Sequence, residues 1–230
     1  MIDLHTHILP GIDDGAADIA QSLQMLEESR NQGVTRCIAT PHIRLHSEGD
    51  IDSFLQQRDA AMAQLAEATA GMQLPQVIAG AEVYMDNDIS HFDGIHRLCM
   101  GNTDFMLVEF PLFSYPGQEC CEWLYNLNRK GIIPIIAHID RYAYWKELIS
   151  GFAGVRLVYQ VNNVRAHEMH GRRLIKKLIG TGYMVVMSSD MHNTDTRPCD
   201  VKKAYDVLKK KMPAYADGLF QENAEMLLSI

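Results

Sequence analysis

Long apolar runs are missing from this sequence, and no stretch approaches the ~20 residues that a membrane-spanning helix requires. The first residues also lack a basic segment and an apolar signal core, which His5 would interrupt. We therefore expect no signal peptide and no membrane insertion. Cys-x-x-Cys spacing is absent from the odd set of cysteines, which are Cys37, Cys99, Cys120, Cys121 and Cys199. Reduced, mostly buried thiols in a cytoplasmic protein are the simplest interpretation.

An excess of basic residues is absent as well. The chain has 21 Lys and Arg against 29 Asp and Glu, which gives a formal net charge of −8. Because nucleic-acid affinity depends largely on Lys and Arg contacts to phosphate, this balance argues against a nucleic-acid partner. It is compatible with metal binding, since clustered carboxylates contribute to the negative charge themselves.

No linker rich in Ser, Gly or Pro, no low-complexity tract and no internal repeat divides the chain. Its 47% hydrophobic and 22% charged residues are ordinary for a globular protein. A length of 230 residues suits one large α/β unit better than two small ones. We therefore predict a single domain over residues 1–230.

Seven apolar runs each end at a residue able to hold a metal or a phosphate. They occupy residues 1–7, 37–42, 77–82, 105–109, 135–138, 157–162 and 185–192. Such continuous runs are typical of parallel strands that are buried on both faces. Helical patterns lie between and after them, at residues 18–32, 53–70, 119–130, 167–179, 202–211 and 221–229. Strands that alternate with helices predict βαβ units and a parallel sheet.

Metal-ligand side chains recur at the ends of these runs. If the strands close into a β/α barrel, their carboxyl ends converge on one face, where barrel enzymes keep their active sites. The side chains then gathered are His5, His7, His42, Glu82, Glu109, His138, Asp190 and His192. A buried glutamate is costly unless it is paired or coordinated. Imidazole with carboxylate suits Mn, Fe or Zn, so the pattern predicts a multinuclear metal site.

Arginines and amides lie near the same strand ends. Arg141 and Arg197 occupy loops beyond ligand-bearing strands, and a guanidinium fork matches phosphate geometry. Arg44 is a weaker third candidate. Gln160 and Asn162 either hydrogen-bond to the metal ligands or cap a strand end. The loops at 44–52 and 87–103 are candidates for substrate contacts. We expect ordinary surface positions for His46, His91, His96, His167 and His170.

The motif at residues 3–15, with His5-Thr6-His7 and Asp13-Asp14-Gly15, resembles the first motif of the polymerase-and-histidinol-phosphatase (PHP) superfamily. More narrowly, the chain resembles the manganese-dependent bacterial protein-tyrosine phosphatases of capsule and exopolysaccharide operons. Further matching segments are residues 40–42, 80–82, 109–111, 137–142, 160–162 and 189–193. They occur in order along nearly the whole chain, which makes the match specific. The family usually has Glu where this chain has Asp140, a mild departure.

This resemblance implies a distorted seven-stranded TIM-like β/α barrel of the PHP type with three metal ions, most simply Mn²⁺, with Fe or Zn as alternatives. The implied ligands of the first ion are His5, His7, Glu82 and Asp190. Glu82 would bridge to a second ion, held also by Glu109 and His138. The third ion would take Asp14, His42 and His192. The spacing leaves Asp13 and Asp14 open, and the family pattern favours Asp14. Arg141 and Arg197 contact phosphate in the family, and we group them with His42 and His192 as catalytic candidates.

Adjacent divalent cations suit phosphate monoesters, whose oxygens must be neutralised during in-line attack. The resemblance implies a phosphotyrosine-protein phosphatase that acts on an autophosphorylating kinase controlling polysaccharide export. A thiolate route would need Arg six residues after a cysteine, and those positions hold Ile43, Phe105, Asn126, Leu127 and Tyr205. The alternatives are a histidinol-phosphate-type phosphatase, a nuclease-type phosphoesterase and a non-enzymatic metal-binding accessory module.

Overall fold

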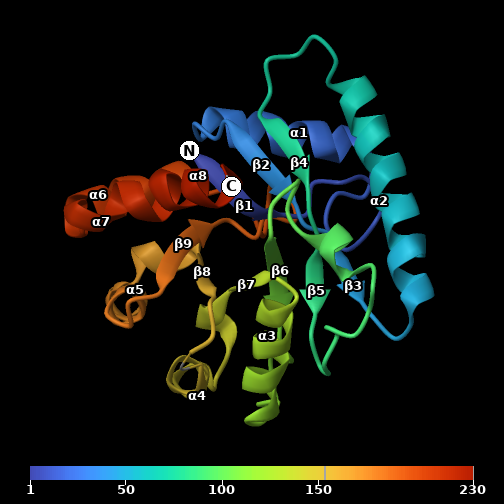
Figure 1. Cartoon of the computed structure of the whole chain (residues 1–230). Helices are drawn as coiled ribbons and strands as arrows, with labels where there is room; N and C mark the ends of the chain where they lie inside the picture. Colours follow the sequence, from blue (N-terminus) through green and yellow to red (C-terminus); the bar gives the residue numbers. More distant parts are fainter. Residues whose placement is uncertain (153, 230) are drawn as a thin grey trace.

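Parallel strands alternate with helices along the chain in the computed structural model, which describes residues 1–152 and 154–229 (Figure 1). The strands within these ranges are β1 (Ile2–Thr6), β2 (Arg36–Ala39), β3 (His42–Arg44), β4 (Gln76–Ala79), β5 (Glu82–Tyr84), β6 (Phe105–Glu109), β7 (Ile133–Ile136), β8 (Val158–Asn162) and β9 (Met184–Ser188). All pairings between them are parallel. The predicted α/β class is confirmed.

Helices occur at all six predicted segments, and two further helices, over residues 145–151 and 213–217, were not predicted. The helices are α1 (Ile19–Asn31), α2 (Glu48–Ala68), α3 (Glu119–Arg129), α4 (Trp145–Gly151), α5 (Met169–Ile179), α6 (Val201–Lys211), α7 (Pro213–Asp217) and α8 (Asn223–Leu228). Short 3-10 turns η1 (Ile95–Leu98), η2 (Ile139–Arg141) and η3 (Asn163–His167) and the π-helical turn η4 (Gly218–Glu222) complete the set. Helix α2 begins five residues before the predicted start, because the Asp50 carboxylate accepts the Ser47 backbone N–H at 2.7 Å. The prediction of a loop over residues 44–52 was therefore wrong for its second half.

Two of the predicted strands are each divided in two. Residues 40–41 separate β2 from β3, and residues 80–81 separate β4 from β5. Pro41 has no backbone N–H to donate to a ladder. At Gly80 a Cβ atom would lie 3.0 Å from the Ile38 side chain, a close contact that favours glycine there. The chain thus moves from a three-stranded sheet, β1-β2-β4, into a six-stranded sheet, β3-β5-β6-β7-β8-β9.

The two sheets meet where β1 and β9 end. The His7 backbone N–H donates to Met191 O at 2.8 Å, and the Asp190 N–H donates to His5 O at 3.0 Å. Thr6 and Met191 form an isolated parallel bridge at the same place. Within residues 1–152 and 154–229, the ladders form two sheets joined by this bridge, so the closed seven-stranded barrel is not confirmed. The arrangement nevertheless brings the ends of the first and last strands together.

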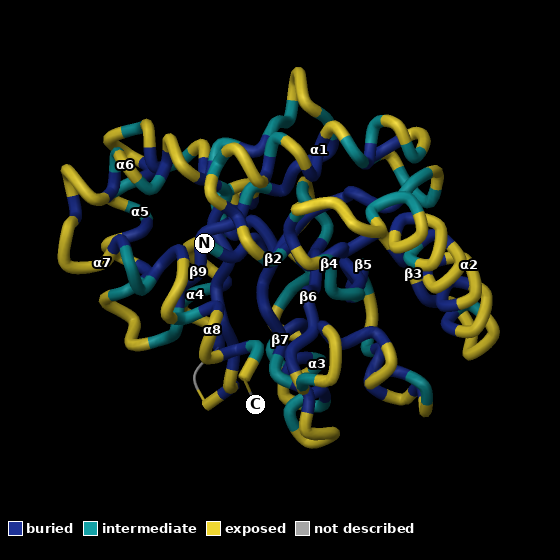
Figure 2. The backbone as a smooth tube through the Cα atoms, turned by 90° about the horizontal axis from the view of Figure 1, so that it is seen from above, coloured by how far each residue is buried: buried dark blue, intermediate teal, exposed yellow. Residues whose placement is uncertain are grey.

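Helices lie around the strands and leave a buried interior, which Figure 2 shows as dark strands inside exposed outer helices. Helix α3 illustrates the cause: its buried residues Cys120, Leu124 and Leu127 recur at helical spacing and form one apolar face. A smaller apolar cluster joins α8 to β1 through Leu227, Ala224, Ile2 and Leu4. None of the helices in the described part of the chain is long and apolar enough to cross a membrane.

Candidate metal centre

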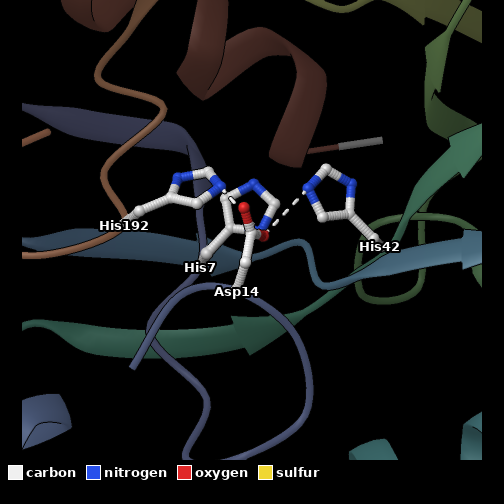
Figure 3. Close-up of side chains that lie close together, drawn as sticks. All are labelled: His7, Asp14, His42 and His192. Atoms are coloured by element: carbon white, nitrogen blue, oxygen red, sulfur yellow. Dashed lines mark ion pairs between the residues drawn. The ribbon is translucent and has the colours of Figure 1, made fainter. Parts of the chain in front are cut away.

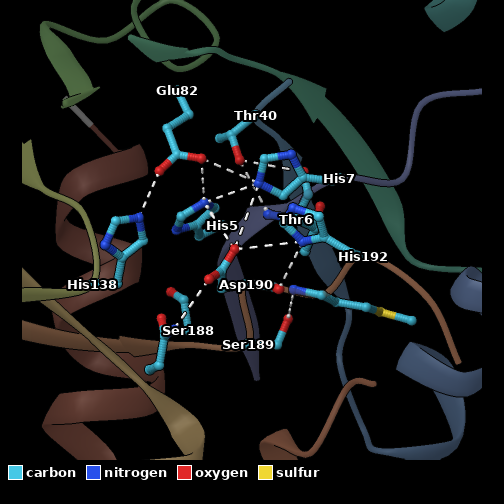
Figure 4. A network of polar contacts seen from close by, with 12 residues as sticks. His5, Thr6, His7, Thr40, Glu82, His138, Ser188, Ser189, Asp190 and His192 are labelled. Atoms are coloured by element: carbon cyan, nitrogen blue, oxygen red, sulfur yellow. Dashed lines mark hydrogen bonds and ion pairs between the residues drawn. The ribbon is translucent and has the colours of Figure 1, made fainter. Parts of the chain in front are cut away.

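Six of the predicted ligands, which are His5, His7, Glu82, His138, Asp190 and His192, lie close together (Figure 4). His5 is in β1, and His7 follows it directly. His42 and Glu82 are the first residues of β3 and β5, and they face each other in the parallel register. The breaks at residues 40–41 and 80–81 therefore place these two side chains next to each other. Asp190 and His192 follow β9, and His138 follows β7.

Glu82 is the hub of the cluster. Its Oε2 lies 2.9 Å from His5 Nε2, 3.2 Å from His7 Nε2 and 3.2 Å from His42 Nδ1. Its Oε1 lies 2.9 Å from His138 Nε2. The carboxylate is fully buried, so it would be strongly destabilising without these partners. Four imidazoles thus converge on one buried carboxylate.

Asp13 and Asp14 occupy different places, which the sequence spacing left open. Asp13 Oδ2 accepts from His7 Nδ1 at 2.6 Å and from the His42 backbone N–H at 3.2 Å, so it orients His7 from behind. Asp14 Oδ1 faces His42 Nε2 and His192 Nε2, each at 3.3 Å (Figure 3). Gly15 is required in this turn, because a Cβ there would lie 2.1 Å from His7 O.

Asp190 connects the cluster to both predicted phosphate-binding arginines. Its Oδ1 lies 3.4 Å from His5 Nε2. Its Oδ2 accepts from Arg197 Nη2 at 2.7 Å and from Arg141 Nη1 at 3.5 Å. Both guanidinium groups are partly exposed. They therefore border the buried cluster on the side where an anion can enter.

Gln160 and Asn162 form a hydrogen-bonded chain between ligands. Gln160 Oε1 accepts from the His138 backbone N–H at 2.5 Å and lies 3.2 Å from His5 Nδ1. Gln160 Nε2 donates to Asn162 Oδ1 at 2.9 Å, and Asn162 Nδ2 donates to Asp190 Oδ2 at 3.1 Å. An acceptor at His5 Nδ1 favours the tautomer that leaves Nε2 with a lone pair facing the cluster. The two amides thus hydrogen-bond to the ligands rather than only capping β8.

His138 and Asp190 also have an unusual backbone conformation. Their φ angles are 28° and 56°, the only positive values at non-glycine residues among those described. Such conformations cost on the order of 1–3 kcal/mol each and cluster at functional sites. Asp and His are among the residue types that adopt positive φ most readily after glycine, but the sequence analysis did not identify these two positions.

Burial and contacts between histidines and carboxylates shift the pKa values of the residues in this cluster. Burial lowers the pKa of His7, but hydrogen bonds with Asp13 and Glu82 outweigh it and raise the pKa to about 10. Burial likewise opposes protonation of His138, yet contacts with Glu109 and Glu82 raise its pKa to about 9. Burial raises the pKa of Glu82, while the adjacent histidines lower it well below its usual value. For His192, burial and the neighbouring His7 charge lower the pKa to about 4, which leaves a neutral imidazole.

These residues fit divalent cations. Three groups of side chains each offer ligand atoms within 4.8 Å of one another: His7, Asp14, His42 and His192; His5, His7 and Asp190; His42, Glu82 and Glu109. The Nε2 atoms of His5 and His7 lie only 3.1 Å apart. Buried His192 Nε2 has no hydrogen-bond partner. A donor set of imidazole and carboxylate that converges in this way is typical of Mn, Fe or Zn sites.

Other candidates lie outside the cluster. Arg44 pairs with Asp86 and lies over the Tyr84 ring. Cys37 is a buried free thiol whose pKa burial raises, which agrees with an inert residue. The histidines that we expected at the surface are all exposed: His46, His91, His96, His167 and His170.

Parallel strands that present imidazoles and carboxylates at their joined ends define a metal-binding α/β protein. The model of the family described as "Capsular polysaccharide synthesis, CpsB/CapC" matches residues 1–229, and the chain belongs to this family.

Named relatives match over nearly the whole chain. Tyrosine-protein phosphatase YwqE of Bacillus subtilis is 31% identical over 237 residues, which cover 99% of this chain and 91% of the relative. Tyrosine-protein phosphatase CpsB of Streptococcus agalactiae is 27% identical, with 99% of this chain and 98% of the relative covered.

Solved structures agree with the family. The chain matches one from "Crystal structures of YwqE from Bacillus subtilis and CpsB from Streptococcus pneumoniae, unique metal-dependent tyrosine phosphatases" with a TM-score of 0.80, 27% identity and coverage of 100% and 94% of the two chains. The lactonase Lmo2620 from Listeria monocytogenes shares the fold, with a TM-score of 0.62, 12% identity and coverage of 98% and 93%.

Proposed function

We propose that this chain is a metal-dependent phosphotyrosine-protein phosphatase. The observation that carries the proposal is the convergence of His5, His7, His42 and His138 on the buried Glu82 carboxylate. The names of the full-length relatives support the phosphotyrosine substrate. The family description supports a role in capsular polysaccharide synthesis.

We assign three Mn²⁺ ions to the cluster, with Fe or Zn as the alternatives. The first would use His5, His7, Glu82 and Asp190, and the second Glu82, Glu109 and His138. The third would use Asp14, His42 and His192. When bound, the ions supply Lewis-acid chemistry: they lower the pKa of water and neutralise negative charge on phosphoryl oxygens.

Arg141 and Arg197 bind the phosphate in this proposal. Both already donate to Asp190 Oδ2, so that carboxylate holds the two guanidinium groups at the entrance to the cluster. A guanidinium fork matches phosphate oxygens, and two forks from different loops orient the ester for in-line attack. Because each side chain is about one-third exposed, the arginines can exchange Asp190 for a substrate oxygen without a change of fold.

A phenolic leaving group fits the residues at the site. Tyrosine leaves as a phenol with a pKa near ~10, so it requires less protonation than a serine alkoxide. His192 is a metal ligand in this proposal and its Nδ1 faces the Asp190 carbonyl oxygen at 3.0 Å, so we assign it no role as general acid. An aryl phosphate is therefore the better match. The proposed protein substrate is a phosphotyrosine-bearing kinase that regulates polysaccharide synthesis.

The test compares substrates before and after metal removal. The purified protein is stripped with a chelator and then supplied with Mn²⁺, Fe²⁺ or Zn²⁺, and hydrolysis is measured on a phosphotyrosine peptide, histidinol phosphate and DNA. We expect Mn²⁺ to restore peptide hydrolysis and His7→Ala to abolish both metal binding and turnover. Faster hydrolysis of histidinol phosphate or DNA would contradict the substrate assignment. Metal uptake without any turnover would indicate an accessory module.

A further inference from the structure

A cavity of about 730 Å³ lies between α3 and α4, outside the metal centre. Its lining combines the rings of Tyr115, Tyr125 and Phe152 with the carboxylates of Glu122 and Glu147. The described residues that line it include no Lys or Arg, and neither glutamate forms an ion pair within the described chain. The cavity is therefore acidic and aromatic, in contrast to the arginine-bordered entrance of the metal centre.

A ladder of aromatic rings leads from the metal centre to this cavity. The His138 and Tyr142 ring centroids are 5.7 Å apart, those of Tyr142 and Tyr144 are 5.3 Å apart, and those of Tyr144 and Tyr115 are 5.3 Å apart. Tyr142 and Tyr144 are themselves buried, so the ladder gives no path for a peptide but limits how far apart the two places lie. An extended peptide advances ~3.3 Å per residue, so the three steps together correspond to at most about five residues.

The segment at residues 110–118, which we call the Phe113 loop, connects the two places. It begins directly after Glu109 and ends at α3. The Tyr142 hydroxyl accepts from the Phe110 N–H at 2.9 Å, and the Tyr144 hydroxyl donates to Pro111 O. At the other end the Cys120 thiol donates to Gly117 O at 3.1 Å. Both ends of the loop are thus held by neighbouring elements.

Phe113 extends from this anchored loop into solvent. It is 98% exposed and lies two residues before Tyr115, which lines the cavity; the cavity rings of Tyr115 and Tyr125 are 37% and 52% exposed. Burying a Phe side chain away from water is favourable, and folding of this chain leaves that stabilisation unused. Exposed aromatics grouped around a cavity mark binding surfaces, and Tyr and Phe are enriched in such surfaces.

We propose that the Phe113 loop and the α3–α4 cavity dock the peptide that surrounds the phosphotyrosine. Phe113 packs on the peptide beside the target residue, and Glu122 and Glu147 bind a Lys or Arg side chain within about five residues of it. Tyr115 and Tyr125 add ring faces for the same cation. This inference rests on the proposed function, to which it adds a sequence preference.

Charge supports a basic side chain over an acidic or apolar one. In the proposed function the phosphate binds beside the positively charged Arg141 and Arg197. The charged side chains that line the cavity are both carboxylates, Glu122 and Glu147. A peptide with an anion at one end and a cation at the other complements both. Such complementarity contributes specificity and decreases with ionic strength.

The first experiment measures kcat/KM of the Mn²⁺-loaded protein on pairs of phosphotyrosine peptides. The two peptides of a pair differ only in having Lys or Gln at one position, and there is one pair for each position up to five residues from the phosphotyrosine. We expect about a fivefold preference for Lys at one or two positions, and its loss in the double variant Glu122→Gln/Glu147→Gln. Glu67→Gln, on exposed α2, is the matched control. No preference in the unmodified protein, or an unchanged preference in the double variant, would overturn the proposal.

The second experiment replaces Phe113 with Ala. We expect kcat/KM for the Lys peptide to fall about tenfold, while hydrolysis of p-nitrophenyl phosphate is unchanged because this substrate has no peptide to dock. Tyr215→Ala on α7, which removes an exposed aromatic elsewhere, is the control. Equal losses on both substrates, or no loss on the peptide, would contradict docking by Phe113.

A binding measurement separates this inference from the proposed function. A fluorescent peptide with a non-hydrolysable phosphonate analogue of phosphotyrosine reports docking without turnover. If p-nitrophenyl phosphate and phosphopeptides are not hydrolysed, the function fails, whereas weaker phosphonate binding by Phe113→Ala still supports docking. If sedimentation shows a dimer that Phe113→Ala dissociates while peptide binding is unchanged, the loop is an interface between two copies and the proposal is wrong.

Discussion

The metal centre has two regions with opposite physical character. His5, His7, Glu82, His138 and Asp190, which we call the inner group, are at most 3% exposed. Asp14, His42, Arg141 and Arg197, which we call the rim, have side chains that are 66%, 39%, 34% and 36% exposed. The inner group follows or belongs to strands, whereas in the rim Asp14 and Arg197 lie in loops, Arg141 lies in the turn η2 and only His42 belongs to a strand.

We infer from this difference that the inner group binds the ions and that the rim contacts the substrate. Charges in the buried region interact strongly because little water screens them, so each inner residue depends on its partners. The rim remains in contact with water, and its side chains exchange partners at low cost. We therefore expect inner substitutions to remove metal and turnover together, and rim substitutions to affect substrate binding or one ion at a time.

The largest expected effect comes from Glu82→Gln. The substitution keeps the size of the hub and removes its charge, so the four converging imidazoles lose their shared anion. Loss of several kcal/mol of transition-state stabilisation lowers kcat by about 10³-fold or more. Metal content per chain and the rate of aryl-phosphate hydrolysis should decrease together, and Glu67→Gln is the control. If the Glu82→Gln variant kept all its metal and its full turnover, the proposed division between inner group and rim would be wrong.

Arg197→Lys tests the rim, and we expect a smaller loss of activity than for Glu82→Gln. Lysine keeps the charge and loses the fork, so we expect kcat/KM to fall about 10²-fold while the metal content is unchanged. Inhibition by inorganic phosphate should weaken in parallel. Arg44→Lys, at an arginine that pairs with Asp86, serves as control and should have no effect. Loss of metal from the Arg197 variant would show that the rim supports the inner group.

Asp14→Asn distinguishes the ions from one another. Because Asp14 pairs with His42 and His192, we expect the protein to bind one ion fewer and to keep the inner ones. A loss of about 2 kcal/mol in transition-state stabilisation corresponds to about 30-fold in kcat/KM. Metal stoichiometry per chain provides the measurement. Simultaneous loss of every ion would mean that the centre assembles only as a whole.

Gln160→Ala should give the smallest change, because Gln160 contacts ligands without being one. Removing its contacts to His5 and His138 should weaken metal affinity by about tenfold, the lower end for such supporting residues. Competition with a chelator measures the affinity, and Gln64→Ala on α2 is the exposed control. A lower melting temperature with unchanged metal affinity would instead assign Gln160 to packing alone.

Local patterns were sufficient for most elements and for the ligand candidates, although helices α4 and α7 were not predicted. Apolar runs that end in His, Glu or Asp can be recognised one segment at a time, because a strand buried on both faces excludes polar residues until its end. Helix stops at Gly33 and Gly131 were readable for the same local reason. The start of α2 was missed, since the capping contact between Ser47 and Asp50 precedes the apolar pattern.

Several features depend on residues far apart in the chain. Asp13 and Asp14 are indistinguishable in spacing, and only the positions of His7 and His192 separate their roles. The breaks at residues 40–41 and 80–81 appear when the two sheets must diverge around the cluster. The left-handed backbone at His138 and Asp190 likewise exists only because neighbouring strands constrain it.

The amino-acid order alone was enough to indicate an α/β protein, a His and carboxylate centre and its family resemblance, because strand burial and ligand chemistry leave local, periodic traces. Folding in three dimensions was needed to make Glu82 the hub, to direct Arg141 and Arg197 onto Asp190, and to leave Phe113 exposed. These features depend on contacts between residues that are far apart in the sequence; His5 and Gln160, for example, are separated by 155 positions. No local pattern encodes such contacts, since their energies exist only after the strands have assembled.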